Sequence, residues 1–566
     1  RAVAESPEAT RLDEAKRKAL ADALRDFVLG GAELKGAARQ RHGAIQDRIG
    51  ALSQAFGEHV LDATDAFTLD VDASRLDGVP EDVRAAARAT AEAAGVTGSV
   101  ATYRLTLQIP CYGPVMQYAS DRALREQLYR AYVTRASEFG PTEFDNSGLM
   151  SELLALRHED AALLGHTHYA DLALVPKMAR SSDEVLGFTN DLVQRARPHA
   201  EHELAELRAF AAADLGLADL QAWDRPYASE KLKQARYEFS TDELKPYFPE
   251  PRVLQGLFNL VEKLFGVQVR PDTAPVWHPS VRYYRLWREG AAVAAFYLDP
   301  HARPGKQSGA WMDAACSRWQ PPQGPLQLPV AHLVCNFAPP VGDQPALLTH
   351  DDVITLFHEF GHGLHHMLTQ VEQLPVSGIN GVEYDAVELP SQFMENFCWE
   401  WDVLQGLSRH VRSGEPLPRA LFDRMVAARH FQSGLQLLRQ AEFALFDMRL
   451  HADPAQANRV QALSVEVNAE VQPMTAPPFY RFAHSFGHIF DGGYAAGYYG
   501  YAWAEVLSAD AFGAFEEAGI MDPATGTRFR EQILERGGAR SALENFKAFR
   551  GREPNIEALL RHRGLA

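Results

Sequence analysis

The sequence predicts a mainly α-helical protein with one small β-sheet near its middle. Long segments repeat apolar residues at the spacing of one helix face, as in ALADALRDFVL and RHGAIQDRIGALSQAFGEHVL. Between about Val276 and Phe337 the pattern changes to short aromatic and β-branched runs bounded by Gly and Pro, namely VRYYRLW, AAVAAFYLD and VAHLVCNF. No internal repeat, low-complexity tract or Ser/Gly linker interrupts the 566 residues. We therefore expect one intertwined unit rather than separable modules.

The helical pattern occupies both ends of the chain. It runs from Arg11 to about Gln108, and further helices are expected in DRALREQLYRAYVTRASEF, SELLALRHEDAALLG and SDEVLGFTNDLVQRARPHAEHELAELRAFAAADLG. The pattern returns after Leu348 and is broken there by proline-bearing loops. We expect residues 1–105 to form an N-terminal helical segment and residues 106–566 to form the functional region, without a clean separation between them.

The charge balance excludes several classes of function. Lys and Arg total 56 against 74 Asp and Glu, a formal net charge of -18, so most of the surface repels phosphate backbones and anionic lipid. No stretch approaches the ~20 apolar residues that cross a bilayer. The four cysteines form no CxxC pair, and the first residues lack a signal-peptide pattern. We expect a cytoplasmic protein that binds neither nucleic acid nor membrane, and we expect a monomer.

A metal-binding motif lies in the segment THDDVITLFHEFGHGLHHML. Residues four apart share one helix face, so His358 and His362 can present two imidazoles to one cation while Glu359 reaches a water on that cation. With 21 histidines in the chain, an HExxH motif would arise by composition in roughly one such protein in twenty. The simpler alternative is two surface histidines beside a solvated glutamate. Apolar neighbours such as Phe357 and Leu364 favour a packed interior instead.

A catalytic zinc ion needs three protein ligands and one open position. The metzincin continuation is absent, because positions 365 and 368 hold His and Leu rather than Gly and His. The segment GVEYDAVELPSQFMENFCWEW offers Glu383, Glu388 and Glu395, and a proline two residues after Glu388 suits a first helical turn. Glu388 is therefore the expected third ligand of one Zn²⁺ ion per chain. Gln392, Asp385 or Glu395 could orient a ligand imidazole.

These segments resemble the thimet oligopeptidase family of zinc metallopeptidases. The resemblance rests on HEFGHGLHHML and GINGVEYDAVELPSQFMENF, and it continues through HSFGHIFDGGYAAGYYGYAWAEVLSADAF and FKAFRGREPNIEALLRH. It implies a zincin-like peptidase with two helical lobes flanking a deep substrate channel, zinc near the channel floor and Glu388 as the third ligand. Such a channel admits flexible peptides and excludes folded proteins. Members of the family usually carry a further helical segment before the point where this sequence starts.

The segment HIFDGGYAAGYYGYAW adds a group of phenols. Tyr494, Tyr498 and Tyr501 fall at i, i+4 and i+7, so a helix would align them on one face. Core packing is the simpler explanation, but four glycines in nine residues weaken a helix and favour a segment that closes on a substrate. The resemblance implies that His488 and Tyr494 contact substrate around the scissile bond and that Tyr501 stabilises the oxyanion. Tyr498 is a weaker candidate for substrate contact.

The expected activity is that of an endo-oligopeptidase acting on short peptides. Zinc would polarise the scissile carbonyl, Glu359 would pass the proton of water to the leaving amine, and Tyr501 with His488 would stabilise the intermediate. Two alternatives stay open. A dipeptidyl carboxypeptidase would use the same metal site on a free C-terminus. A non-catalytic peptide-binding protein would hold zinc structurally, which calls for a fourth protein ligand.

Overall fold

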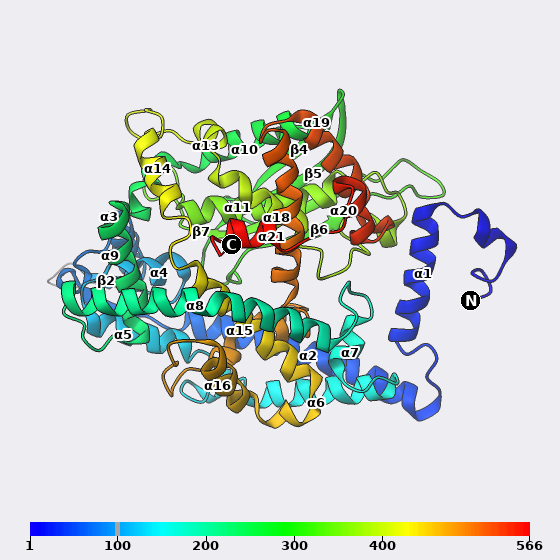
Figure 1. Ribbon diagram of the computed structural model, residues 1–566, viewed down its shortest axis with the longest axis horizontal. Coiled ribbons are helices and arrows are strands. Elements are labelled where there is room, and N and C mark those ends of the chain that lie inside the picture. The colour runs from blue at the N-terminus through cyan, green and yellow to red at the C-terminus, as the bar shows by residue number, and fades with distance from the viewer. Residues whose placement is uncertain (97–101, 566) are drawn as a thin grey trace.

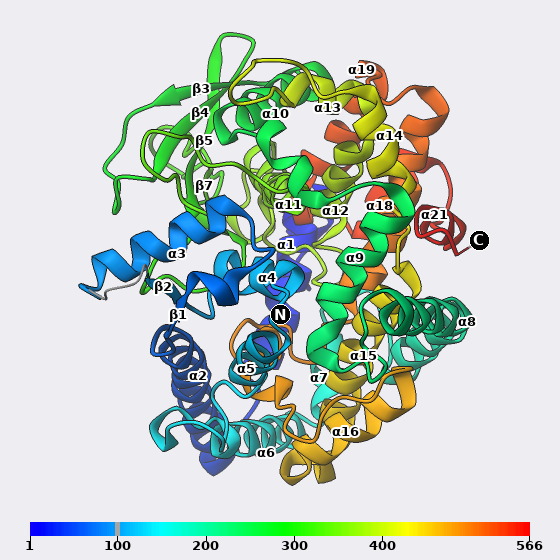
Figure 2. The ribbon, with the colours of Figure 1, turned by 90° about the vertical axis from the view of Figure 1, so that its left-hand side faces the viewer.

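The computed structural model describes residues 1–96 and 102–565. It confirms the mainly α-helical prediction, because 59% of the residues are helical and 9% lie in strands. The elements gather around two large apolar cores, which form the upper and lower lobes in Figures 1 and 2. Across the described residues, no helix combines the length and the apolar character needed to cross a membrane.

The upper lobe combines the main β-sheet with the helices around it. Its core includes Phe296, Phe357 and Phe393, all fully buried. Its helices are α10 (Glu250–Phe265), α11 (His350–Met367), α12 (Leu389–Glu395), α13 (Trp401–Leu407), α14 (Arg419–Ala427), α19 (Pro523–Phe529) and α20 (Ala542–Arg550).

The lower lobe is built from helices alone. Its core includes Leu192, Leu445 and Ile489, and α8 and α15 pack along each other in the most extensive contact between two of its helices. Its helices are α2 (Gly36–Asp65), α6 (Ser147–Leu163), α7 (Tyr169–Leu174), α8 (Ser182–Asp214), α9 (Arg225–Tyr237), α15 (Ser433–Ala452), α16 (Val460–Val471), α17 (Gly487–Phe490) and α21 (Glu557–His562).

Helix α18 (Gly500–Ala518) belongs to both lobes. Tyr501 and Trp503 near its start pack against the lower core, whereas Phe512 and Phe515 near its end are part of the upper core. This helix therefore connects the two lobes directly.

The main sheet has the strand order β3-β4-β5-β7-β6, in which β5 and β7 are parallel and the other neighbours are antiparallel. The prediction named the three inner strands but missed the two edges. Strand β3 is mostly exposed and contains a proline, and β6 is partly exposed, so neither has the continuous apolar character of an inner strand. The strands are β3 (Gln268–Asp272), β4 (Arg282–Arg288), β5 (Ala291–His301), β6 (Trp311–Cys316) and β7 (Val330–Phe337).

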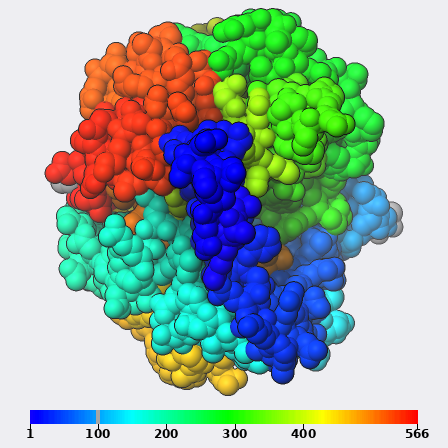
Figure 3. Space-filling view, turned by 90° about the vertical axis from the view of Figure 1, so that its right-hand side faces the viewer, coloured from blue at the N-terminus to red at the C-terminus, as the bar shows by residue number. Residues whose placement is uncertain are grey.

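A third, smaller core lies among the N-terminal elements and includes Leu76, Leu105 and Leu124. The prediction of helices alone from Arg11 to Gln108 was wrong here, because two strands pair antiparallel within that range. Each has only four residues, too few to give an alternating pattern in the sequence. The elements are β1 (Leu69–Asp72), β2 (Thr102–Leu105), α3 (Glu81–Ala93), α4 (Ile109–Tyr118) and α5 (Arg122–Val133). Helix α1 (Glu14–Leu29) lies on the outside of the molecule (Figure 3).

Helices α11 and α12 approach closely because Gly361 has no side chain. A Cβ atom at Gly361 would lie 2.4 Å from the carbonyl oxygen of Pro390 and 2.6 Å from the Cα atom of Ser391. Gly361 is the fourth residue of the HEFGH motif, and Glu388 immediately precedes α12. The close approach therefore sets the distance between the motif and Glu388.

We expect Gly361→Ala to lower the free energy of unfolding by about 1–3 kcal/mol, because the added methyl group pushes against the backbone of α12. Gly187 in α8 is a matched control, since a Cβ atom there meets nothing within 4 Å. Gly187→Ala should stabilise the protein by about 0.5–1 kcal/mol. Urea unfolding checks both signs, and equal midpoints for the two variants would contradict the close approach.

Candidate metallopeptidase site

Helix α11 carries the HExxH motif and begins at a well-defined cap. Thr349 Oγ1 accepts a hydrogen bond from Asp352 N at 3.0 Å, and Asp352 Oδ2 accepts one from Thr349 N at 2.9 Å. This reciprocal pair satisfies N–H groups that the first turn leaves without helical partners. The start of the helix is thereby fixed two turns before the first motif histidine.

The two motif histidines and Glu388 converge on one point. His358 Nε2 lies 3.1 Å and His362 Nε2 lies 3.0 Å from the same atom, Glu388 Oε2. One ligand atom from each of the three residues lies within 4.8 Å of the other two. The structure thus brings together the three residues that the sequence predicts as metal ligands.

Glu388 is buried although it carries a charge, with only 1% of its surface exposed. Ser391 Oγ donates a hydrogen bond to its Oε2 at 3.0 Å, and the Tyr494 hydroxyl donates to its Oε1 at 2.7 Å. Burial acts against ionisation, but the imidazoles of His362 and His358 outweigh it and hold the pKa of Glu388 well below its usual range. The carboxylate therefore stays ionised at neutral pH.

Glu359 has the features of a proton acceptor. It is 4% exposed, and its Oε2 has no hydrogen-bond partner among the described residues. Burial raises the pKa of the Glu359 carboxyl, although the imidazoles of His358 and His362 oppose the shift. A carboxylate whose pKa moves toward neutrality can both take up and release a proton at neutral pH.

Glu395 orients the first histidine. Its Oε1 lies 2.6 Å from His358 Nδ1, an arrangement that leaves Nε2 for a metal. The sequence left three candidates for such a role. Gln392 Nε2 donates instead to the carbonyl oxygen of Tyr501 at 2.9 Å, and Asp385 contacts other residues described below. The geometry therefore favours Glu395.

The segment that carries the tyrosines is not the helix that its spacing suggests. Helix α18 starts only at Gly500, and residues 491–499 form turns and bends. Gly493 and Ala496 have φ angles of 82° and 48°, which a right-handed helix does not allow. The tyrosines are therefore presented by an irregular segment that leads into α18.

The rings of this segment nevertheless form one cluster. The Tyr501 ring lies 5.2 Å from that of Tyr494, 5.1 Å from that of Tyr498 and 6.0 Å from that of His488. Burial and a nearby carboxylate raise the pKa of Tyr501 well above its usual value, so its hydroxyl keeps its proton. The Tyr498 hydroxyl is already committed, because it donates to Gln440 Oε1 at 3.0 Å.

Asp447, which the sequence analysis did not single out, holds this segment by its backbone. Its fully buried carboxylate on α15 accepts hydrogen bonds from the N–H groups of Ala496, Gly497 and Tyr498, each at 2.9 Å. A lone aspartate within the apolar helical run FALFDMRL is the signal that could have indicated it. Asp447 therefore supplies the acceptor that the irregular backbone needs.

Asp385 ties the same segment to the upper lobe. Its Oδ2 accepts a hydrogen bond from the Tyr499 hydroxyl at 2.7 Å and one from Ala179 N at 2.9 Å, while its Oδ1 accepts from Met178 N at 2.8 Å. Asp385 lies three residues before Glu388. The tyrosine segment and the metal-ligand segment are thus joined through one carboxylate.

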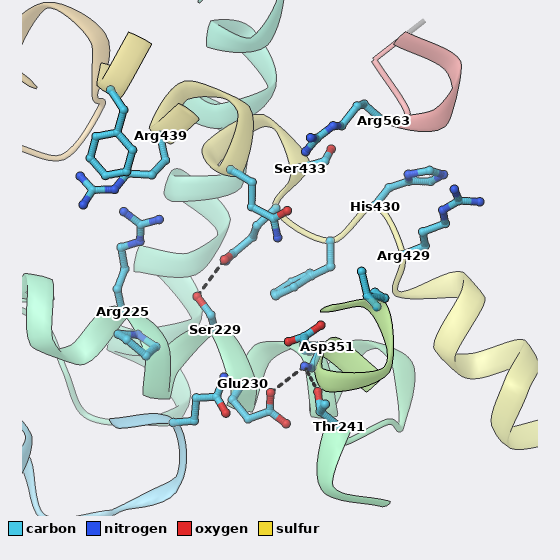
Figure 4. Close-up of a pocket in the computed structure, with 18 of the residues that line it drawn as sticks. Arg225, Ser229, Glu230, Thr241, Asp351, Arg429, His430, Ser433, Arg439 and Arg563 are labelled. Carbon is cyan, nitrogen blue, oxygen red and sulfur yellow. Dashed lines mark hydrogen bonds and ion pairs between the residues drawn. The ribbon is translucent and has the colours of Figure 1, made fainter. Parts of the chain in front are cut away.

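A cavity of about 1070 Å³ lies between the lobes. Gln392, Glu395, His488 and Tyr498 line one part of it, and it extends from there to α9 and α15 (Figure 4). Its volume slightly exceeds the roughly 300–1,000 Å³ of small-molecule pockets. The cavity next to the candidate metal site is therefore large enough to hold several atoms of an extended peptide in addition to the group that reacts.

The residues present fit a divalent transition metal. Two imidazole nitrogens and one carboxylate oxygen form a ligand set of catalytic zinc sites, which keep a fourth position open. Magnesium and calcium prefer oxygen ligands throughout. The unpartnered Oε2 of Glu359 belongs to the residue next to His358 and is suited to accept a hydrogen bond from a group at the open position.

Solved structures share this fold at low sequence identity. PZ peptidase A with an inhibitor has a TM-score of 0.55 at 14% identity, over 97% of this chain and 84% of that chain. A protein named oligoendopeptidase F from Bacillus anthracis has a TM-score of 0.57 at 15% identity, over 100% of this chain and 80% of that chain. These similarities show a zincin-like fold, and the match of the chain to a peptidase family shows that it is a metallopeptidase.

Residues 115–565 match peptidase family M3, and the chain belongs to that family, which confirms the resemblance. It is 51% identical over 561 residues to oligopeptidase A of Salmonella typhimurium, covering 98% of this chain and 82% of the relative. It is 34% identical over 553 residues to dipeptidyl carboxypeptidase of Escherichia coli, covering 95% and 79%. Membership of the family implies a divalent metal and peptide substrates.

We expect Asp447→Asn to loosen the tyrosine segment, because the side-chain amide turns a donor toward backbone N–H groups that are themselves donors. Hydrogen exchange at amides 496–498 should accelerate by about tenfold or more, while exchange in α11 stays as in the wild type. Asp453→Asn is the control, since this aspartate follows the same helix but hydrogen-bonds only to its near neighbours. Unchanged exchange at 496–498 in the Asp447 variant would contradict the anchoring role.

Proposed function

We propose that this chain is a zinc-dependent endo-oligopeptidase that cleaves internal bonds of short, unfolded peptides. One observation carries the proposal: His358, His362 and Glu388 converge next to the buried carboxylate of Glu359, whose Oε2 has no hydrogen-bond partner in the described part of the chain. The name oligopeptidase A of a relative at 51% identity supports the same class of substrate.

The residues of the site divide the chemistry among them. A zinc ion held by His358, His362 and Glu388 would polarise the scissile carbonyl and activate water for attack. Glu359 takes a proton from the attacking water and delivers it to the leaving amine nitrogen. Tyr501 donates a hydrogen bond to the carbonyl oxygen as that oxygen gains charge, and His488 lies on the same side.

The other two tyrosines have supporting roles. Tyr494 keeps Glu388 in place through its hydrogen bond, and its ring, which stacks on that of Tyr501, contacts the peptide. Tyr498 lines the cavity and contributes apolar surface to peptide binding, because its hydroxyl is engaged with Gln440.

The surroundings of the site and the unpaired cysteines support the proposed substrate, location and oligomeric state. Both lobes wall the cavity, so an extended peptide fits between them and a folded domain does not. All four cysteines are unpaired, which suits the reducing cytoplasm. One chain supplies every residue of the site, so the proposed form is a monomer.

Two alternatives make different predictions. A dipeptidyl carboxypeptidase requires a free C-terminal carboxylate, whereas an endo-oligopeptidase cleaves peptides whose C-terminus is amidated. The higher identity to oligopeptidase A, 51% against 34%, favours an oligopeptidase over a dipeptidyl carboxypeptidase. A purely structural zinc site would need a fourth protein ligand, and within the described part of the chain only three residues converge.

The test of the proposed function is Glu359→Gln, which removes the proton acceptor and keeps the shape of the side chain. Cleavage of amidated peptides should fall by about 10²–10⁴-fold, the usual contribution of a general base. Zinc content should stay at the wild-type level, because Glu359 is not a ligand. Peptide hydrolysis and metal analysis are measured on the same samples, and retained hydrolysis by the variant would refute the mechanism.

Tyr501→Phe should lower kcat by about 10²–10³-fold and change KM little, because an oxyanion donor acts in the transition state rather than in the ground state. Tyr498→Phe is the matched comparison, since its hydroxyl donates to Gln440. We expect that variant to lose less than about tenfold in kcat. A kcat of Tyr501→Phe within about threefold of wild type would eliminate the oxyanion role.

Glu388→Gln should weaken zinc retention, because it removes the anionic ligand and leaves only the two imidazoles. The measurement is the zinc content of dialysed protein beside that of the wild type. Glu383→Gln is the control. Glu383 belongs to the same segment, but it accepts a hydrogen bond from Ala542 N, and Ala542 is far from the histidines in sequence. Equal zinc in the Glu388 variant and wild type would remove Glu388 from the ligand set.

A further inference from the structure

The charged side chains that line the cavity between the lobes carry a net positive charge, whereas the whole chain is negatively charged. Six lysines and arginines line it against four aspartates and glutamates, whereas the whole chain carries a net charge of -18. Walls of low dielectric constant concentrate such a field within the cavity. A negatively charged group is therefore favoured inside it, in contrast to the outer surface.

Arg225 supplies a positive charge that no carboxylate of the described residues contacts directly. It is the first residue of α9, and among the described residues no hydrogen bond or ion pair engages its guanidinium. The preceding residue, Asp224, is held by Arg122 at 2.7 Å and by Arg125 at 2.8 Å. The start of the helix is thus anchored, while the side chain of Arg225 extends into the cavity (Figure 4).

Arg439 faces Arg225 from α15 (Figure 4). Its guanidinium lies 3.2 Å from Glu442, donates to the Tyr480 hydroxyl and stacks 4.1 Å from the Phe443 ring, so its own charge is matched and its orientation is fixed. Burial and then the charge of Arg439 lower the pKa of Arg225. The two guanidinium groups repel each other, and an anion between them would remove that repulsion.

We propose that Arg225 and Arg439 form a binding subsite for a carboxylate of the peptide substrate. The proposal rests on the peptidase function proposed above. Guanidinium groups bind carboxylates through two parallel hydrogen bonds, which gives this pair a geometric preference for that anion. A peptide offers carboxylates at its C-terminus and on the side chains of Asp and Glu.

The subsite lies within reach of a peptide that occupies the candidate site. His488 is 5.7 Å from Phe486, Phe486 is 5.1 Å from Phe443, and Phe443 is 4.1 Å from Arg439. These three distances place Arg439 no more than about 15 Å from His488, a span of four or five extended residues at about 3.3 Å each. A carboxylate up to that many residues from the scissile bond can therefore reach the pair.

The experiment uses one neutral fluorogenic peptide in matched forms. One set has either a free or an amidated C-terminus, two to five residues after the cleaved bond. The second set is amidated and carries Glu or Gln at the same distances on either side of the bond. Values of kcat/KM are measured for wild type and for R225Q. Dissociation constants of the same peptides are measured with E359Q and with the E359Q/R225Q double variant.

Wild type should prefer at least one carboxylate peptide over its neutral partner by about tenfold, and R225Q should bring that ratio close to one. The same loss should appear in the dissociation constants. A preference confined to the free C-terminus identifies the terminal carboxylate as the ligand, and a preference for Glu in amidated peptides identifies the side chain. Either result supports the subsite.

Arg429 provides the matched control. It lines the same cavity at another end, has no hydrogen bond or ion pair among the described residues and stacks 5.1 Å from the Trp399 ring (Figure 4). R429Q should keep the wild-type ratio. An equal loss in R429Q would show a general field rather than a subsite and would overturn the proposal.

The proposal is also overturned if wild type shows no preference for any carboxylate peptide, or if R225Q keeps the preference. Should R225Q fail to fold, Arg225→Met takes its place, because it keeps the apolar stem and loses the charge. If wild type cleaves none of the peptides, the proposed function fails. The dissociation constants measured with E359Q and with E359Q/R225Q then still test the subsite independently.

Discussion

The candidate site depends on keeping one carboxylate ionised where water hardly reaches. Glu388 is 1% exposed, and an isolated carboxylate at such a place would take up a proton. Two imidazoles and the hydroxyl groups of Ser391 and Tyr494 stabilise the charge instead. The same requirement explains the close contact of α11 and α12 at Gly361, because a wider separation would move the carboxylate away from the histidines.

The tyrosine segment holds several phenols in place without a regular helix. An irregular backbone leaves N–H groups without helical partners, and buried N–H groups need acceptors. Asp447 provides them from the lower lobe, and Asp385 holds the Tyr499 hydroxyl from the upper lobe. The geometry of the ring cluster is thus determined by two aspartates, neither of which touches the metal-ligand atoms.

The sequence predicted the features that are encoded locally. Long helices and the inner strands have clear periodicities, and the HExxH spacing places two imidazoles on one helix face by geometry alone. The edge strands β3 and β6 and the short pair β1 and β2 lack such a signal. Choosing Glu395 over Gln392 or Asp385 required distances between helices, which no spacing within one segment contains. The arginine pair was missed for the same reason, since Arg225 on α9 and Arg439 on α15 are far apart in sequence and come together only when the lower lobe folds.

Helix α18 couples the stability of both lobes to the position of Tyr501, the proposed oxyanion donor. Tyr501 lies in its first turn against the lower core, and the same helix ends inside the upper core at Phe515. Because α18 is a rigid helix embedded in both cores, loosening of either core displaces the whole helix. The position of the Tyr501 phenol therefore depends on both lobes. Partial unfolding of either lobe displaces it before the whole chain has unfolded.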